Sequence, residues 1–152
     1  MLETGMKVPS FTIPTDTGSF SMADKVGKNV VVFFFPRADT SGCTKEAIAF
    51  SGLMEDFGAA GCEVIGISKD TATKQGKFRA KHGLTCELGA DEGSDVCEQF
   101  GVWVEKSMYG RTYMGIQRAT FLVDGTGTIA AVWPKVKVAG HAEEVLEQVN
   151  AL

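Results

Sequence analysis

The sequence predicts an α/β protein with a mixed central sheet flanked by helices and an N-terminal hairpin extension. Patterns typical of strands alternate with patterns typical of helices over most of the chain. The apolar run at residues 30–35 lacks a polar/apolar alternation, as expected of a strand covered on both faces. Turn sequences at residues 16–18 and 124–127 lie between extended segments and predict one hairpin near each end of the chain.

The first third of the chain contains the predicted N-terminal hairpin and the central strand. Residues 11–13 and 19–21 flank the first turn and predict the two hairpin strands. The central strand covers residues 30–35 and ends at Pro36, because proline cannot donate to a strand ladder. Apolar residues then recur at helical spacing from Cys43 to about Ala59, which predicts one helix there.

The rest of the chain predicts a second strand at residues 62–67, parallel to the first because a helix crosses over between them. The later predicted elements are a helix over 72–82 capped by Asp70 and closed by Gly83, a short strand near 86–88, a helix capped by Ser94, strands at 120–123 and 128–132, and a helix over 142–149. Residues 103–113 contain glycine and are predicted to be irregular. This order fits a thioredoxin-like core, and we expect one domain over residues 1–152.

Composition and charge exclude several classes of function. The net charge of −4 argues against a protein that binds nucleic acid or an anionic membrane, since those surfaces require clustered Lys and Arg. No apolar run is long enough to span a membrane, and the opening residues contain no recognisable export signal. The four cysteines form no C-x-x-C pair, which favours a reducing compartment, and we expect a cytoplasmic protein.

Cys43 is the main candidate for chemistry. The buried strand ends at Pro36, a polar turn follows, and a helix begins close to Cys43. This order places the sulfur at the carboxyl end of the sheet and in the first helical turn, where free N–H groups and the helix dipole stabilise a thiolate. A free cysteine is more commonly a small buried apolar residue, but the polar turn beside Cys43 favours reactivity.

The motif P-x-x-x-T-x-x-C, present as Pro36, Thr40 and Cys43, resembles the active-site motif of peroxiredoxins. The sequence GCTKE at 42–46 is similar to the PrxQ branch, also called bacterioferritin comigratory proteins. Further matches lie at residues 97–103, 109–111 and 118–124, and the similarity runs from about residue 6 to the end of the chain.

The resemblance implies a thiol-dependent peroxidase that reduces hydrogen peroxide and alkyl hydroperoxides and needs neither a cofactor nor a metal. Cys43 would attack the peroxide as a thiolate and become a sulfenic acid. Thr40 would offer its hydroxyl to the peroxide, and Pro36 would shield the pocket from water. Arg118, from a neighbouring strand, would stabilise the thiolate and the separating oxygens.

The chain departs from this family where a second cysteine usually resolves the sulfenic acid. Many PrxQ proteins carry that cysteine five residues after the first, where this chain has Ile48. Cys62 and Cys86 begin strands and should lie far from Cys43, whereas Cys97 should lie near the same sheet edge. Cys97 is therefore the best internal partner, although a packed helix cysteine is the favoured interpretation.

We therefore expect a one-cysteine enzyme, a monomer or weak dimer, that uses an external thiol such as thioredoxin, glutaredoxin or a glutathione-like molecule. A disulfide oxidoreductase on the same fold is an alternative, but it normally requires C-x-x-C. A redox sensor that signals through Cys43 without turnover is another.

Several other residues need no catalytic role. His82 and His141 lack metal-ligand spacing, and Lys74, Lys77, Arg79 and Lys81 are interpreted as a solvated helix face. Four side chains of the segment predicted to be irregular could pack in a loop or form one wall of the peroxide pocket, and the two alternatives are equally weighted: Trp103, Met108, Tyr109 and Tyr113.

Overall fold

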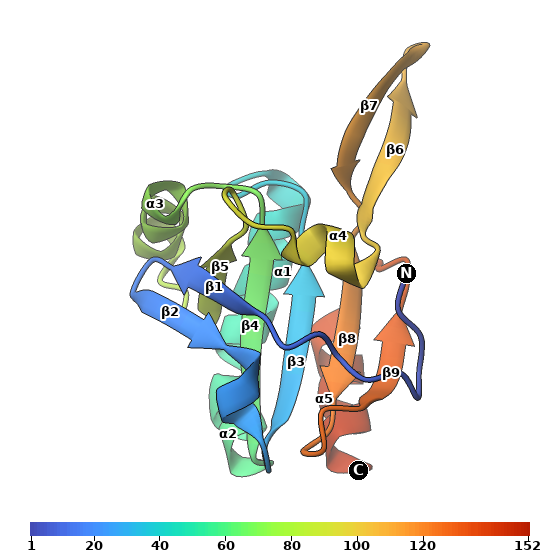
Figure 1. Cartoon of the computed structure of the whole chain (residues 1–152). Helices are drawn as coiled ribbons and strands as arrows, with labels where there is room; N and C mark the ends of the chain where they lie inside the picture. Colours follow the sequence, from blue (N-terminus) through green and yellow to red (C-terminus); the bar gives the residue numbers. More distant parts are fainter.

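A seven-stranded mixed sheet forms the centre of the computed structural model, which describes all 152 residues (Figure 1). Seven strands form this sheet, and β6 and β7 form a separate pair. The strands are β1 Thr12–Thr15, β2 Gly18–Ser21, β3 Asn29–Phe34, β4 Cys62–Ser68, β5 Glu87–Ala90, β6 Trp103–Met108, β7 Arg111–Ile116, β8 Ala119–Val123 and β9 Ile129–Trp133. The helices are the 3₁₀ helix η1 Met22–Lys25, and α1 Ser41–Gly52, α2 Met54–Ala59, α3 Ala72–His82, α4 Val96–Phe100 and α5 His141–Asn150. The order in the sheet is β2-β1-β5-β4-β3-β8-β9. As predicted, β3 and β4 are parallel, and the antiparallel β8 beside β3 makes the sheet mixed.

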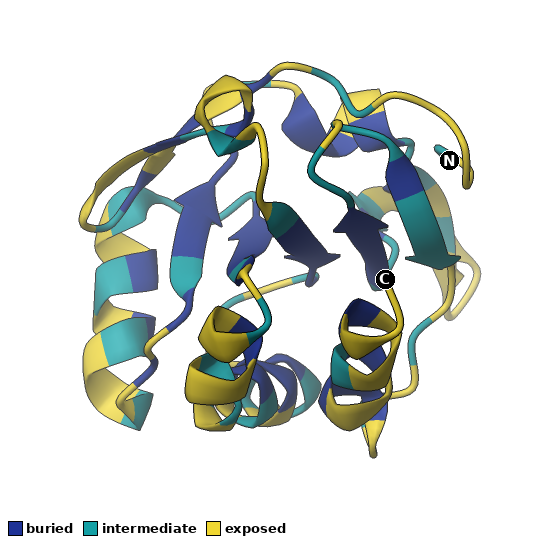
Figure 2. Cartoon of the chain, turned by 90° about the horizontal axis from the view of Figure 1, so that it is seen from below, coloured by how far each residue is buried: buried dark blue, intermediate teal, exposed yellow.

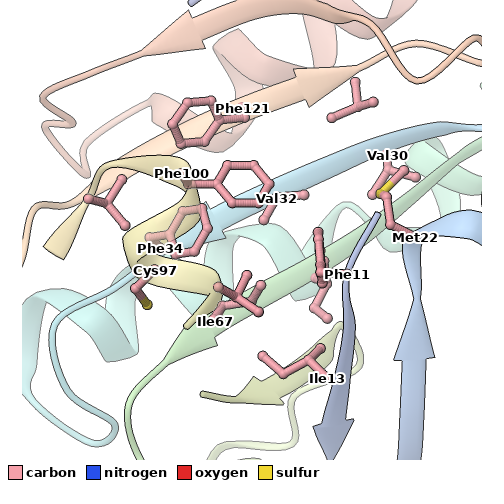
Figure 3. Packing of buried hydrophobic residues seen from close by; sticks show 14 of the residues in the cluster. Phe11, Ile13, Met22, Val30, Val32, Phe34, Ile67, Cys97, Phe100 and Phe121 are labelled. Carbon is pink, nitrogen blue, oxygen red and sulfur yellow. The ribbon is translucent and has the colours of Figure 1, made fainter. Parts of the chain in front are cut away.

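Both faces of β3 are covered, which explains its uninterrupted apolar sequence. Val31 and Phe33 belong to a core cluster that includes residues of α1, α2, α3 and α5. Val32 and Phe34 belong to a second cluster, on the face covered by the N-terminal segment and α4 (Figure 3). Each long helix turns a buried side toward the sheet and an exposed side outward (Figure 2). None of the helices is both long and apolar enough to cross a membrane.

The segment predicted to be irregular is a β-hairpin, and that prediction is wrong. Strands β6 and β7 pair only with each other and project from the body of the molecule (Figure 1). The turn consists of Tyr109 and Gly110, with φ values of 53° and 76°. Positive φ at both central residues is the geometry of a tight hairpin turn, for which Tyr-Gly is an uncommon sequence. Because the hairpin packs on no second layer over most of its length, its strands lack the alternation that identifies a strand.

Three smaller differences concern helix ends. The helix predicted over residues 43–59 is two helices, because Gly52 ends α1 and glycine is unfavourable in a helix interior. The cap of α3 is Thr71, whose hydroxyl accepts from the Lys74 N–H, whereas Asp70 accepts the Ala38 N–H. The amides of Val96 and Cys97 at the start of α4 donate to the carboxylate of Asp91, five residues before the helix, and not to the predicted cap Ser94.

Candidate active site

Cys43 lies in the first turn of α1, beyond the carboxyl end of β3. Its side chain is 1% exposed and packs in the cluster on the helical face of the sheet. Thr40 occupies the N-cap position, but its hydroxyl donates to the Arg37 carbonyl at 2.8 Å and caps no amide. The first amides of α1 therefore have no side-chain acceptor. These donors and the helix dipole favour negative charge beside the Cys43 sulfur.

Arg118 reaches the same place from the other side. It directly precedes β8, whose first residue, Ala119, pairs with Phe34 at the end of β3. Its Nη2 donates to Cys43 Sγ at 3.3 Å. Gly42 leaves room for this contact, because a Cβ at that position would lie 3.2 Å from Nη2. Burial alone would lower the pKa of Arg118, but the negative charges of Cys43 and Glu46 outweigh burial and raise it.

Glu46 is the site residue that the sequence reasoning missed. It follows Cys43 by three residues, so both side chains project from the same face of α1. Glu46 is 1% exposed, and its Oε1 accepts a hydrogen bond from Arg118 Nη1 at 2.8 Å. Burial raises the pKa of Glu46 to about 7, although the Arg118 charge opposes this shift. Its Oε2 has no hydrogen-bond partner. The sequence did contain one indication of this role, because Glu46 occupies an apolar position of the amphipathic helix predicted from Cys43.

The three residues Cys43, Arg118 and Glu46 thus form a buried hydrogen-bonded row. Arg118 lies in the middle and donates one N–H to each neighbour. A neutral Glu46 leaves most of the guanidinium charge to the sulfur, whereas an ionised Glu46 competes for it. The row can therefore stabilise a thiolate and, after attack, a developing negative charge on oxygen.

Pro36 and Thr40 lie near Cys43 but do not bond to its sulfur. Pro36 is half-buried and lines a pocket of about 390 Å³ beside the site. Trp103 and Tyr113 line the same pocket, but Cys43, Thr40 and Arg118 do not, so a role for these two side chains in the wall of the peroxide pocket stays a prediction. The other two, Met108 and Tyr109, lie at the exposed end of the hairpin.

Cys62 and Cys86 pack in the same core cluster as Cys43 but, as predicted, lie away from its sulfur. Cys62 pairs with Asn29 at the start of β3, at the opposite end of the strand from the turn that leads to Cys43. Cys86 immediately precedes β5, and its sulfur accepts a hydrogen bond from the Ser51 hydroxyl at 3.6 Å. Burial raises the pKa of Cys62 to about 12 and that of Cys86 to about 11.

Cys97 lies on the other face of the sheet from Cys43. It packs in the cluster that contains Phe34 and Ile67, where Figure 3 shows its sulfur among apolar side chains. Its N–H donates to Asp91 Oδ2 at 2.8 Å. Burial and the neighbouring Asp91 carboxylate raise the pKa of the Cys97 thiol. Proximity along the sheet edge therefore does not bring the two sulfurs together.

The histidines have structural partners. His82 Nε2 lies 2.8 Å from Asp39 Oδ1, and His141 Nε2 lies 2.8 Å from Thr120 Oγ1. No group of three or more His, Cys, Asp or Glu side chains could hold a metal ion. The basic face of α3 is only partly solvated, since Arg79 forms two hydrogen bonds to an aspartate in the turn between β1 and β2.

The chain matches the AhpC/TSA family over residues 4–132. It is 48% identical to the bcp protein of Coxiella burnetii, with 95% of this chain and 97% of the relative covered. It is 41% identical to peroxiredoxin Bcp of Escherichia coli, with 95% and 94% covered. A structure of Xylella fastidiosa PrxQ superposes with a TM-score of 0.94 at 31% identity, covering 99% of this chain and 97% of that one. A Xanthomonas campestris bacterioferritin comigratory protein, studied for alkyl peroxide reduction, superposes with a TM-score of 0.91 at 33% identity, covering 98% of each chain.

Proposed function

The chain belongs to the AhpC/TSA family, has a thioredoxin-like fold and is a thiol-dependent peroxidase, and we propose that Cys43 is its peroxidatic nucleophile. One observation carries this assignment. Cys43 is the cysteine whose sulfur accepts a hydrogen bond from a charged side chain, Arg118. The thiolate is the reactive form of cysteine, and a neighbouring cation stabilises it.

In the proposed reaction the Cys43 thiolate attacks the terminal oxygen of a hydroperoxide. The S–O bond forms with an electron pair from sulfur while the O–O bond breaks, which leaves Cys43 as a sulfenic acid. The departing oxygen takes a proton and leaves as water or as an alcohol. Arg118 stabilises the charge that moves from sulfur to oxygen, and Pro36 limits access of water. The Thr40 hydroxyl turns from the Arg37 carbonyl to the bound peroxide.

We further propose that an external thiol resolves the sulfenic acid. That thiol condenses with the sulfenic acid to release water and form a mixed disulfide, and a second thiol then frees Cys43. The positions of the other cysteines support this assignment. Cys62 lies at the opposite end of β3, Cys86 contacts Ser51 at the far end of α1 from Cys43, and Cys97 lies on the other face of the sheet. Thioredoxin, glutaredoxin and a glutathione-like molecule are the candidate reductants.

Three broader assignments complete the proposal. A monomer or weak dimer suffices, since the row of Cys43, Arg118 and Glu46 comes from one chain. Four unpaired cysteines suit a reducing compartment such as the cytoplasm. Residues 1–152 act as one domain, because the central sheet takes strands from both ends of the chain.

The test is peroxide consumption by single cysteine variants, followed by mapping of the oxidised product. Cys43→Ser should abolish turnover, whereas Cys62→Ser, Cys86→Ser and Cys97→Ser should retain it. One equivalent of peroxide should give a sulfenic acid on Cys43 that a dimedone-type reagent traps in wild type and in Cys97→Ser alike. Turnover by Cys43→Ser would refute the nucleophile, and a Cys43–Cys97 disulfide as the main product would refute the one-cysteine mechanism.

A further inference from the structure

The oxidised Cys43 sulfur has to be reached by a thiol, which is larger than the peroxide that oxidises it. Cys43 is 1% exposed, and its sulfur lies against Arg118. A peroxide brings only its terminal oxygen to this sulfur, whereas a thiol has to bring its own sulfur and the carbon chain behind it. The turn that carries Cys43 therefore moves between the two steps, and the contacts that hold this turn control the movement.

Two residues in the segment 36–42 form hydrogen bonds to other elements, and the inner one is Ala38. Its N–H donates to Asp70 Oδ2 at 2.7 Å. The same oxygen accepts from the Ser68 hydroxyl at 2.6 Å, and that hydroxyl in turn accepts from Gln75 Nε2 at 2.9 Å. Ser68 and Gln75 are fully buried, so this inner anchor is part of the core.

The outer anchor is Asp39, whose carboxylate binds the last turn of α3. Its Oδ2 accepts from Lys81 Nζ, and its Oδ1 lies beside His82 Nε2, both at 2.8 Å. These contacts, with that of His82 first, lower the pKa of Asp39, so it remains an anion near neutral pH. The Asp39 side chain is 42% exposed and that of Lys81 is 62% exposed. Exposed ion pairs contribute little to stability, so the outer anchor is the one that opens readily.

The backbone of Asp39 gives this contact control over the start of α1. Its φ of 62° lies in the left-handed region, which aspartate tolerates better than most residues but still at a cost in free energy. Asp39 directly precedes Thr40, the N-cap residue of α1, so its conformation sets the direction in which the chain enters the helix. The contacts with α3 hold Asp39 in this conformation, and their loss allows the first helical turn, which contains Cys43, to shift.

We propose that Asp39 is a positioning residue that latches the turn before α1 to α3, and that opening of this latch gives the reducing thiol access to Cys43. This inference rests on the proposed function, because it takes Cys43 to be oxidised by a peroxide and reduced by an external thiol. With the latch closed, the sulfur lies beside Arg118 and attacks the peroxide. With the latch open, the first turn of α1 moves while Ala38 stays anchored, and the sulfenic acid condenses with the thiol.

The test measures the two half-reactions separately in Asp39→Asn. Asparagine also tolerates the left-handed conformation, so this variant removes the charge of the latch and keeps the backbone preference. Oxidation by hydrogen peroxide should slow slightly, because the Cys43 turn is held less firmly beside Arg118. Condensation of the sulfenic acid with thionitrobenzoate, followed by the loss of its absorbance, should accelerate about fivefold, the effect of losing exposed ion pairs worth about 1 kcal/mol.

Three further variants make the result specific to the latch. Lys81→Met combined with His82→Gln opens it from the α3 side and should also accelerate condensation. This pair changes the net charge in the opposite direction from Asp39→Asn, so acceleration in both excludes a simple charge effect on the anionic probe. Adding Asp39→Asn to the pair should change the rate no further. Lys77→Met removes an exposed charge from the same helix and should leave both half-reactions unchanged.

Alkylation of the reduced protein tests the latch without peroxide chemistry. A bulky maleimide should label Cys43 several-fold faster in Asp39→Asn than in wild type, whereas the buried Cys62 and Cys86 should label at unchanged rates. An unchanged thionitrobenzoate rate, an unchanged Cys43 labelling rate, or equal acceleration at all three cysteines would overturn the inference. Absence of hydrogen peroxide turnover in wild type would instead refute the proposed function, and faster labelling of Cys43 alone would still support the latch.

Discussion

Cys43 and Cys97 occupy equivalent positions at the starts of two helices but have opposite electrostatic surroundings. Both are buried, and both lie in the first turn of a helix that follows a strand of the central sheet. At Cys43 the helix start has no side-chain cap, and a guanidinium contacts the sulfur. At Cys97 a carboxylate, Asp91, accepts the first amides of the helix.

This comparison shows that a helix N-terminus alone does not make a cysteine reactive. The partial positive charge of a helix start is available to a thiolate only where no other anion uses it. Asp91 uses it at α4, and burial together with the Asp91 charge disfavours a negative charge on Cys97. At α1 the Thr40 hydroxyl bonds elsewhere, so the amides beside Cys43 stay available. The neighbouring charge, more than the position in the helix, distinguishes the two cysteines.

The largest expected effect comes from removal of the cation at Cys43. Arg118→Met should slow sulfenic acid formation about a hundredfold to a thousandfold, the usual cost of losing one preorganised donor at a site of developing charge. Stopped-flow measurement of tryptophan fluorescence, or competition with a reference peroxidase, gives the rate.

Two controls make this result specific to the contact with sulfur. Arg111→Met removes an exposed arginine from the β6–β7 hairpin and should change the rate little. Arg118→Lys should recover part of the loss, because it restores a charge without the second donor to Glu46. A rate for Arg118→Met within a few-fold of wild type would mean that the helix start suffices, and the comparison with Cys97 would lose its basis.

The sequence was most informative where a pattern has a single structural explanation. The apolar run at residues 30–35 could only be a strand covered on both faces, and β3 is such a strand. Pro36, Thr40 and Cys43 carried the resemblance, and the structure brings Arg118 to the Cys43 sulfur as that resemblance implied. The catalytic roles of these residues stay predictions.

The sequence was least informative about which face of the sheet a residue occupies. Cys97 was placed correctly near the carboxyl edge of the sheet, but the choice of face depends on how the chain passes over β3 and β4. Glu46 was missed because its burial is compensated by Arg118, a residue 72 positions later in the chain. The β6–β7 hairpin was missed because its exposed strands follow no apolar periodicity.

The next effect in size is the pH dependence that Glu46 gives to stability. Its pKa rises from 4.5 to about 7 on folding, so the folded state holds this proton more tightly than the unfolded state. The resulting stabilisation is fully present below about pH 4.5 and is lost as the pH rises through about 7. A pKa shift of this size corresponds to roughly 3 kcal/mol in the free energy of unfolding. Wild type should therefore lose stability of this order as the pH rises, and Glu46→Gln should remove most of that loss. Urea unfolding of wild type and variant across this pH range measures the difference.

Wild type must be compared with Glu46→Gln because other groups titrate in the same pH range as Glu46. Burial lowers the pKa of His141, which makes stability rise with pH near its ordinary value and partly masks Glu46. The difference between wild type and Glu46→Gln cancels this contribution. Parallel pH profiles for the two proteins would show that the Glu46 carboxyl keeps an ordinary pKa beside Arg118.

The smallest effect tests the carboxylate at Cys97. Asp91→Asn removes the negative charge, while the side-chain oxygen can still accept one of the two amides at the start of α4. The loss of a helix cap should cost about 1 kcal/mol of stability. Without the Asp91 charge the Cys97 thiol should ionise more readily, so native-state alkylation of Cys97 in a Cys43→Ser background should accelerate a few-fold. Cys62 and Cys86 serve as internal references, because their alkylation rates report any general loosening of the fold. If Cys97 accelerates no more than these two, burial alone keeps it unreactive, and Asp91 serves only to cap α4.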